Sequence, residues 1–580
     1  MGRGYAPYAG RLSAVRFGFG LGLALTTLRL FSVQVLSHGT YDLLASGQHD
    51  LLAKLLPERG EIYAYDALSP TGRVPVAVNR SLHLVYAVPK EVADPAAFAQ
   101  ALAPLLGLDP AVLELVLAKQ DDPYEPLAHE VTDEVAGSVA ALQLPGIRVV
   151  PETIRAYPAG DSLGAVTGFV GYVGDRRRGQ YGLEQYWDST LAGTQGSIRS
   201  ERDAAGSLIA LGENDVVPAV NGADLYLTID ASVQQKACAA LREAVVKHGA
   251  AGGSTIVMDP STGAVRALCN SPSFDPNHYR EVTDQTSFID SVSSVTYEPG
   301  SVFKPITMAG AIEAGVVSPE TTYTDTGEVA IGPHTIRNSD LKAHGLQTMT
   351  QVLESSLNTG AIYAMRQLGA AKFVGAVKAF GFGQRTGVEL PHEQPGSIRS
   401  LSSKNEIYPA TASFGQGITV TPLQMVAAFG ALAHGGRLMQ PYLVDEVRYP
   451  DGRVEQTKPT VVRQVVSPRT AAVLSAMLVS VVEKGHGKRA GVPGYYVAGK
   501  TGTAQVSLPN GQGYDPQRSI GTFVGFAPVD NPRFVMLVKI SDPRDVVFAE
   551  SSAAPVFGEV AKFLLDYYQV PPQRDVTRTP

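Results

Sequence analysis

The stretch that decides the fold of this chain is Tyr297-Glu298-Pro299-Gly300-Ser301-Val302-Phe303-Lys304-Pro305. Its first half, Glu298-Pro299-Gly300, predicts a turn, and the apolar recurrence after Pro305 predicts a helix. We therefore expect Ser301 at a helix N-terminus, where free backbone N–H groups and the helix dipole favour developing negative charge. Lys304 follows one turn later on the same face of that helix.

The pair Ser301-x-x-Lys304 allows two interpretations. A serine hydroxyl becomes a nucleophile when a neighbour takes its proton, and a desolvated, neutral lysine can be that neighbour. Alternatively, Ser301 caps a helix and Lys304 is a solvated surface side chain, which is the commoner meaning of this pattern when it occurs alone. Features elsewhere in the chain decide between the two.

Two further short motifs follow in order. They are Ser356-Leu357-Asn358 and Lys500-Thr501-Gly502-Thr503, the second on a strand-like run from Val497 to Val506. Each is ordinary in isolation, as a helix cap with a surface amide or as a strand that ends in a turn. Together with S-x-x-K, in this order, they match the signature set of serine acyl transferases that includes class A β-lactamases and penicillin-binding proteins.

Acyl transfer explains the residue types of the first two motifs. Ser301 would attack a peptide carbonyl, and Lys304 would accept its proton. Ser356 can pass protons between Lys304 and the leaving amine. Asn358 can hold Lys304 and a substrate amide, because its side chain both donates and accepts hydrogen bonds.

The third motif supplies binding and electrostatics. Lys500 adds positive potential, which favours a neutral Lys304 and attracts a substrate carboxylate. The hydroxyl groups of Thr501 and Thr503 can bind that carboxylate, and Gly502 leaves room for a substrate to pair with the strand edge. The backbone N–H groups of Ser301 and Thr503 are the predicted oxyanion hole.

Composition narrows the class of protein. The chain has 580 residues, 44% of them hydrophobic and 18% charged, which describes a foldable protein of two or three domains. A net charge of −7 argues against a nucleic-acid partner. Cys238 and Cys269 are the two cysteines, and we interpret both as small core residues. No Cys/His cluster has metal spacing, and the predicted chemistry needs no metal or cofactor.

The N-terminus predicts a membrane anchor. Residues 12–36 carry only Arg16 and Arg29 as charges, and the run is long enough to span a bilayer if these side chains snorkel. We predict a cytoplasmic tail over 1–10, a single transmembrane helix over 11–36 and an extracytoplasmic remainder. A cleaved signal peptide is the alternative, disfavoured because the run is long and no small-x-small site follows closely.

The remaining chain predicts two domains. Residues 37–225 combine short β-branched runs with two helices that begin at Asp94-Pro95 and Asp109-Pro110, and they indicate a non-catalytic pedestal. Residues 226–570 contain two strands, a helical middle, three more strands and a closing helix over 554–568. This order predicts one α+β domain whose sheet is completed by distant segments. The tail 571–580 is predicted to be disordered.

Longer stretches strengthen the interpretation. They are Arg59-Gly60-x-Ile62, Arg155-Ala156-Tyr157-Pro158, Gly182-Leu183-Glu184-x-x-Trp187-Asp188, Ser413-Phe414-Gly415-Gln416-Gly417 and Phe523-Val524-Gly525-Phe526-Ala527-Pro528. With the three motifs, they make the sequence resemble a class B penicillin-binding protein, a monofunctional peptidoglycan D,D-transpeptidase, over nearly the whole chain. One departure is Ala64, which stands where the family usually has Asp and puts any pedestal contact of that turn in doubt.

The resemblance implies further properties. It implies a penicillin-binding transpeptidase domain with a five-stranded antiparallel sheet flanked by helices, an elongated α+β pedestal of dimerisation type, and acylation of Ser301 by β-lactams. The expected partners are stem peptides ending in D-Ala-D-Ala, a SEDS-family glycan polymerase and other membrane proteins of cell division or elongation. The run at Ser413 and the compact pedestal favour the division-type, FtsI-like branch.

Rival functions stay open at this point. They are an elongation-type transpeptidase, a D,D-carboxypeptidase, a serine β-lactamase and a membrane-anchored β-lactam sensor. A β-lactamase needs a second base for deacylation, and the nearest candidate is Glu393, for which we predict a structural role. A glycosyltransferase signature is absent from 37–225, so glycan polymerisation would come from a partner.

Overall fold

The computed structural model describes residues 20, 23, 50–55, 57–119, 122, 124–173, 176–201, 214–507 and 513–575. These residues form two compact units, 1–58 with 193–221, and 59–192 with 222–580. The predicted tail 1–10 and transmembrane helix 11–36 lie almost entirely outside the described residues. Within the described part of the chain, no helix has the length and apolar character needed to cross a membrane.

The first unit contains a small antiparallel sheet. Its strands are β1 (Asp50–Leu55), β8 (Gly196–Glu201) and β9 (Asn214–Val217), in the order β1-β8-β9. Each neighbouring pair of strands is antiparallel. Strands β1 and β8, which are about 150 residues apart in sequence, lie side by side in this sheet.

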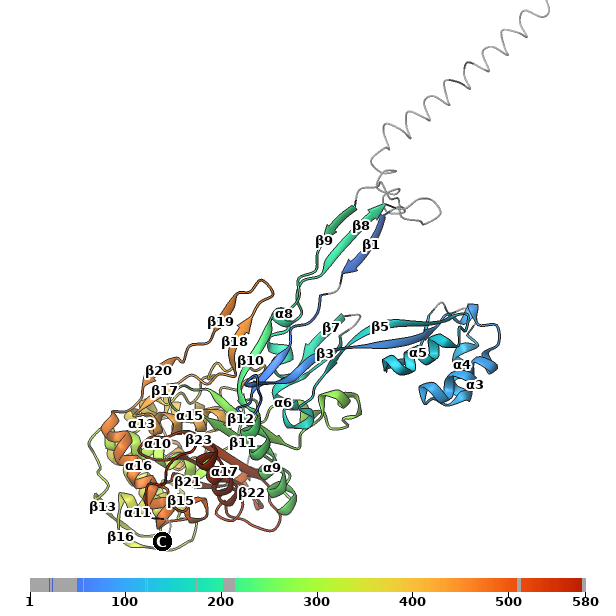
Figure 1. Ribbon diagram of the computed structural model, residues 1–580. Coiled ribbons are helices and arrows are strands. Elements are labelled where there is room, and N and C mark those ends of the chain that lie inside the picture. Colours follow the sequence, from blue (N-terminus) through green and yellow to red (C-terminus); the bar gives the residue numbers. More distant parts are fainter. Residues whose placement is uncertain are drawn as a thin grey trace, which may run out of the picture. The chain divides into compact units, whose positions relative to one another are not determined.

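The second unit contains a seven-stranded sheet with the order β19-β18-β10-β2-β3-β4, in which β5 also pairs with β3 (Figure 1). Its strands are β2 (Ile62–Tyr65), β3 (Arg73–Ala87), β4 (Glu125–Val131), β5 (Ile147–Ala156), β10 (Asp224–Asp230), β18 (Val444–Arg448) and β19 (Val454–Gln456). Ala64, the departure from the family pattern, is fully buried in β2 opposite Val74, where an apolar side chain fits.

Three helices pack beside the far end of β3 and β5 around their own apolar core. They are α3 (Pro95–Leu106), α4 (Pro110–Leu117) and α5 (Asp133–Ala141). As predicted, Asp94 and Asp109 cap α3 and α4 with side-chain oxygens, and proline follows each cap. Two short helices, α6 (Gly164–Thr167) and α7 (Gly182–Tyr186), and the hairpin β6 (Phe169–Val173)–β7 (Arg176–Gln180) follow.

A buried ion cluster joins three of the stretches singled out in the sequence. Glu184 is fully buried and binds Arg59 at 2.6 Å and Arg155 at 2.8 Å. Arg59 also binds Asp188 at 2.8 Å. Burial by itself raises the pKa of Glu184, but the two guanidinium groups outweigh burial and hold this pKa below its usual value. Three pedestal segments are therefore tied to one carboxylate.

The catalytic sheet confirms the predicted α+β fold. Its strands are antiparallel in the order β12-β11-β23-β22-β21, namely β11 (Gly252–Met258), β12 (Val265–Ser271), β21 (Ala498–Ser507), β22 (Tyr514–Ala527) and β23 (Phe534–Ser541) (Figure 1). Helices α9 (Ala231–Lys247) and α17 (Ala553–Tyr567) cover one face, and α15 (Pro422–Ala433) and α16 (Pro468–Glu483) the other. Alternate residues enter the two cores: Val535 and Leu537 face α15, whereas Met536 and Val538 face α17.

The helical middle carries the first two motifs. Its main helices are α10 (Lys304–Glu313), α11 (Met349–Glu354), α12 (Asn358–Leu368), α13 (Ala370–Ala379) and α14 (Ile407–Ala412). Short strand pairs interrupt it: β13 (Thr322–Asp325) with β16 (Gly345–Thr348), β14 (Glu328–Ile331) with β15 (His334–Arg337), and β17 (Arg437–Met439) with β20 (Val461–Gln464).

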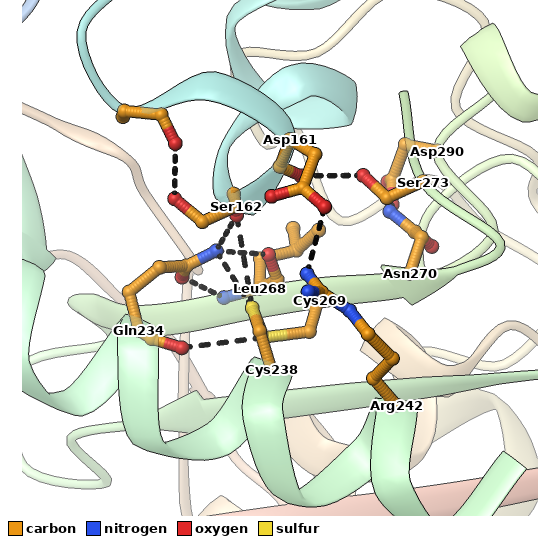
Figure 2. Close-up of a disulfide and its surroundings, with 11 residues drawn as sticks. Asp161, Ser162, Gln234, Cys238, Arg242, Leu268, Cys269, Asn270, Ser273 and Asp290 are labelled. Carbon is orange, nitrogen blue, oxygen red and sulfur yellow. Dashed lines mark hydrogen bonds and ion pairs between the residues drawn. A yellow bond between two sulfur atoms is a disulfide. The ribbon is translucent and has the colours of Figure 1, made fainter. Parts of the chain in front are cut away.

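The cysteines are the small core residues that we expected, and they are also bonded to each other. Cys238 on α9 and Cys269 on β12 are both buried, and they form a disulfide with a Cα–Cα distance of 5.2 Å (Figure 2). Beside it, Gln234 donates to the carbonyls of Ser162 (2.7 Å) and Leu268 (2.8 Å). Sequence spacing could not reveal the pair, because a helix and a strand bring the two residues together.

The start of the C-terminal tail is also more ordered than predicted. The Gln573 N–H donates to the Gly494 carbonyl (2.9 Å), and the Tyr496 N–H donates to the Gln573 side chain (2.9 Å). Arg574 pairs with Glu483. Residues 571–575 therefore pack on the domain, and 576–580 lie outside the described residues.

Candidate active site

Ser301 lies in a 3-10 turn, η6 (Gly300–Phe303), which runs directly into α10. This matches the predicted helix start, with one extra tight turn. Gly300 has φ of +60°, and its N–H donates to the Gly415 carbonyl (3.0 Å). A Cβ on Gly415 would lie 2.2 Å from the Gly300 carbonyl oxygen, so the glycine of the Ser413–Gly417 run lets that segment support the turn.

Lys304 is buried, with 1% of its surface exposed. Its Nζ donates to the backbone carbonyl of Ser356 and lies 3.2 Å from Ser356 Oγ. The solvated-lysine alternative is thus excluded. Helix α10 places Lys304 at its first position, directly after the turn that carries Ser301.

Ser356 stands in the tight link between α11 and α12 and has φ of +56°, an unfavourable region for a residue with a Cβ. The buried Leu357 side chain fixes this link to the core. Held in this conformation, Ser356 presents both its carbonyl and its hydroxyl to Lys304.

Lys500, on the edge strand β21, is fully buried. Its Nζ lies 3.0 Å from Ser356 Oγ, 3.0 Å from the Thr501 carbonyl and 3.3 Å from Thr501 Oγ1. One serine hydroxyl therefore bridges the two lysines. The structure brings together the three motifs, although about 50 and 200 residues separate the second and third from the first.

The electrostatics of this lysine pair favour neutral amines. Burial lowers the pKa of Lys304 well below its usual value, and the charge of Lys500 lowers it further. Burial also lowers the pKa of Lys500, to about 7. Both conditions that the sequence set for a lysine base, burial and a nearby second lysine, are met.

Asn358 begins α12, and its side chain has a partner that the sequence did not predict. The amide donates to the Arg337 carbonyl (2.9 Å), and the Asn358 N–H donates to Asn338 Oδ1 (2.9 Å). The predicted grip of Asn358 on Lys304 and on a substrate amide stays a prediction.

A buried polar network behind Asn358 was missed entirely. Asp325 accepts from Thr359 Oγ1 (2.7 Å) and Asn338 Nδ2 (2.9 Å), and Asn338 in turn holds the first N–H groups of α12. The network fixes the start of α12, and so the Ser356 link. In the sequence, only the two turn-like stretches around Asp325 and Asn338 indicate this network.

Gly502 explains why β21 lies against the nucleophile turn. A Cβ on Gly502 would lie 2.9 Å from Val302 Cγ1 and 3.0 Å from both the Pro299 carbonyl oxygen and the Val302 nitrogen. Close packing of the strand on η6 is therefore a sufficient reason for glycine here, apart from the predicted room for substrate. Thr503 Oγ1 accepts from the Ala549 N–H (3.1 Å), which leaves its O–H free to donate to a ligand.

Glu298 is a further residue that the sequence did not assign. Its carboxylate accepts from the Gly417 N–H (3.1 Å) and the Tyr514 hydroxyl (2.9 Å). It thus clamps the nucleophile stretch to β22 and to the Ser413–Gly417 run.

Glu393 has the structural role that we expected. It is buried and accepts from Thr386 N (2.6 Å), Thr386 Oγ1 (2.7 Å) and Gly387 N (3.1 Å). These bonds occupy the carboxylate within its own loop. Within the described residues no group of His, Cys, Asp and Glu side chains could hold a metal ion.

The fold and the Ser301, Lys304 and Lys500 constellation define a serine transpeptidase of the penicillin-binding type. Comparison with known proteins agrees. Residues 253–562 match the family model of the penicillin-binding protein transpeptidase domain, and residues 54–227 match that of the penicillin-binding protein dimerisation domain. The chain belongs to this family.

Several relatives are similar over most of their length. Stage V sporulation protein D of Bacillus subtilis is 35% identical over 525 residues, covering 90% of this chain and 80% of the relative. The peptidoglycan D,D-transpeptidase FtsI of Escherichia coli is 29% identical over 506 residues, covering 86% and 82%. The crystal structure of penicillin-binding protein 3 of Mycobacterium tuberculosis with aztreonam has a TM-score of 0.69 at 27% identity, covering 90% and 99%.

Proposed function

We propose that this protein is a peptidoglycan D,D-transpeptidase that crosslinks stem peptides through an acyl-enzyme on Ser301. The observation that carries the proposal is the Ser356 hydroxyl, which lies between two buried lysines at 3.2 and 3.0 Å. This arrangement supports Lys304 as the base and Ser356 as the proton path for Ser301, which lies in the turn directly before Lys304.

The reaction proceeds in two acyl transfers. Neutral Lys304 takes the Ser301 proton while Oγ attacks the carbonyl of the penultimate D-Ala. The C–N bond breaks, and the departing D-Ala amine receives a proton through Ser356. The amine of a second stem peptide then attacks the ester, loses its proton along the same path, and releases Ser301.

Substrate binding uses β21. The Thr501 and Thr503 hydroxyls and Lys500 bind the terminal carboxylate, Asn358 binds a substrate amide, and the N–H groups of Ser301 and Thr503 stabilise the oxyanion. A β-lactam, which offers a strained amide and a carboxylate, enters by the same route and acylates Ser301. The occupied Glu393 carboxylate argues against the second base that a β-lactamase would need.

The cellular setting is division-type wall synthesis at the bacterial cell membrane. In the proposed organisation, residues 1–10 are cytoplasmic, 11–36 span the membrane once, 37–225 form the pedestal and 226–570 the transpeptidase domain. The Cys238–Cys269 disulfide supports an extracytoplasmic catalytic domain, because disulfides persist in oxidising compartments. A SEDS-family polymerase and other division proteins are the proposed partners.

Labelling with a fluorescent penicillin, followed by peptide mapping, tests the proposal. We expect one label on Ser301, and none in Ser301→Ala. A label that survives in this variant, or a native protein that takes no label, contradicts the proposal. Incubation with a donor stem peptide and a separate amine acceptor then distinguishes crosslinking from the carboxypeptidase alternative, in which water takes the acyl group.

A further inference from the structure

A cavity of about 460 Å³ lies outside the site described above, between the β6–β7 hairpin and the segment that follows β12. Tyr172, Gln180 and Tyr181 line it from the hairpin side, and Tyr279, Arg280 and Gln285 from the other. None of these residues has a role in the proposed acyl transfer. All lie in the same compact unit as Ser301.

The floor of the cavity is a rigid aromatic stack. Phe169 stacks on Tyr279 with ring centroids 4.2 Å apart and an interplanar angle of 13°. Phe288 contacts both Phe169 (5.1 Å) and Tyr181 (5.2 Å). At the rim, Tyr172 is 62% exposed. The cavity thus contains aromatic ring surface that is accessible to a ligand.

The polar groups around this ring surface are donors and amides. Arg280 is exposed, and its Nε donates to the Tyr279 hydroxyl (3.1 Å), which orients the guanidinium at the rim. Gln180 and Gln285 add amides that both donate and accept. No carboxylate belongs to the described residues that line the cavity. Such a lining favours a neutral ligand rich in hydroxyl and amide groups over a cation.

A saccharide has this chemistry. Aromatic side chains bury the apolar C–H faces of sugar rings, while amide and guanidinium groups bind hydroxyl and acetamido oxygens. We propose that this cavity binds the N-acetylated glycan strand of the polymer whose stem peptides the enzyme joins. The inference deepens the proposed function and rests on it.

The position along the chain suits a polymer that also reaches Ser301. Tyr181 and Phe288 line, in addition, a second cavity of about 290 Å³, whose wall includes Ser294. Ser294 precedes Ser301 by seven residues, so the two lie no more than about 25 Å apart even for a fully extended chain. A stem peptide of about five residues extends over roughly 17 Å. A stem peptide attached to a glycan along these two cavities thus covers about two thirds of that upper bound, and the proposal requires the actual separation in the folded chain to lie within the reach of the peptide.

The test is a titration of the purified full chain with glycan oligomers of alternating N-acetylglucosamine and N-acetylmuramic acid that carry no stem peptide and whose lactyl carboxyl groups are capped as simple amides. We expect wild-type binding that weakens at least tenfold in Tyr172→Ala and in Arg280→Ala. Tyr186→Ala is the matched control, since Tyr186 is 48% exposed and does not line either cavity; its binding should match wild type. The rate of penicillin labelling at Ser301 should be equal in all four proteins, which also checks their folding.

Absence of wild-type binding, or equal binding by wild type and all variants, overturns the inference. If a variant folds poorly, Gln285→Ala, which changes an exposed side chain, replaces it with the same expectation. If the proposed function is wrong, the wild-type protein takes no penicillin label. The glycan titration does not depend on that labelling, so it still tests the inference.

Discussion

Lys304 Nζ lies 3.2 Å from Ser356 Oγ, close enough for a direct proton transfer. The same oxygen lies 3.0 Å from Lys500 Nζ. A hydroxyl has one hydrogen and two lone pairs, so Ser356 can accept from one amine while it donates to the other. Burial lowers the pKa of both amines, which favours the neutral form that a proton acceptor needs.

Replacing the base should reduce acylation sharply. Lys304→Met keeps a long apolar stem in a buried position but removes the amine, so we expect the rate of penicillin acylation to fall by about 10²- to 10⁴-fold. Stopped-flow or gel-based labelling measures this rate. Lys372→Met, an exposed lysine on α13, is the control and should label at the wild-type rate. A Lys304→Met protein that labels within a few-fold of wild type would exclude Lys304 as the base.

Lys500→Met should shift the pH dependence of acylation. The rate falls at low pH as Lys304 becomes protonated, and the Lys500 charge lowers the pKa of Lys304. Removing that charge raises the pKa of Lys304, so the acid limb of the rate profile should move to higher pH. The measurement is the labelling rate across pH 5–9 with a substrate that has no carboxylate, which separates this effect from lost carboxylate binding. An unmoved limb contradicts the argument.

The same substitution should flatten the pH dependence of stability. Lys500 has a pKa of about 7 in the folded protein and 10.5 as its ordinary value. Between these values the unfolded chain binds more protons, so the free energy of unfolding rises with pH across this window. Urea unfolding at pH 7 and pH 10 should show a smaller rise for Lys500→Met than for wild type. An equal rise in the two proteins would show that Lys500 does not titrate as inferred.

Gly502→Ala tests the packing of β21 on the nucleophile turn. The new Cβ would meet Val302 and the Pro299 carbonyl at 2.9–3.0 Å, which forces the strand or the turn to move. We expect a loss of about 1–3 kcal/mol in the free energy of unfolding, together with slower acylation. Gly375→Ala on α13 is the control, because its Cβ meets nothing within 4 Å and alanine favours a helix. Full activity in Gly502→Ala would refute this packing role.

The disulfide should contribute to stability without touching the chemistry. Replacing Cys238 and Cys269 together by alanine opens a loop of 31 residues, and we expect a loss of roughly 3–4 kcal/mol in the free energy of unfolding. Penicillin labelling of the folded double variant should be unchanged, since the pair is remote from the three motifs in the fold. Thermal unfolding with and without a reductant provides a second check: only the wild type should respond.

The sequence predicted those features that local patterns encode. Alternating β-branched runs and capped helices indicated the strands and helices of the catalytic domain, and the motif order indicated Ser301, Lys304 and Lys500. It could not predict contacts created by the fold. Asp325 ends β13 and Asn338 directly follows β15, and their bonds to Thr359 exist only once these strand pairs have formed. For the same reason, the sequence left open whether Cys238 and Cys269 pair.

Gly502 shows a different limit. A glycine was expected here because it leaves room for the substrate. The structure shows a second reason, since a Cβ at this position would also meet Val302 and the Pro299 carbonyl inside the domain. A motif indicates where a constraint exists, and three-dimensional packing shows what imposes it.

The buried Glu184 has a consequence for how this chain can change over time. Arg59, Arg155 and Asp188 come from three segments spread over about 130 residues. Arg59 and Arg155 both bind the Glu184 carboxylate, and Asp188 binds Arg59. Loss of Glu184 leaves the buried Arg155 without its ion partner, whereas coordinated replacement by apolar side chains need not. Mutational paths through these positions should therefore be strongly non-additive, so that an exchange of single pedestal segments between relatives succeeds only when the four residues are exchanged together.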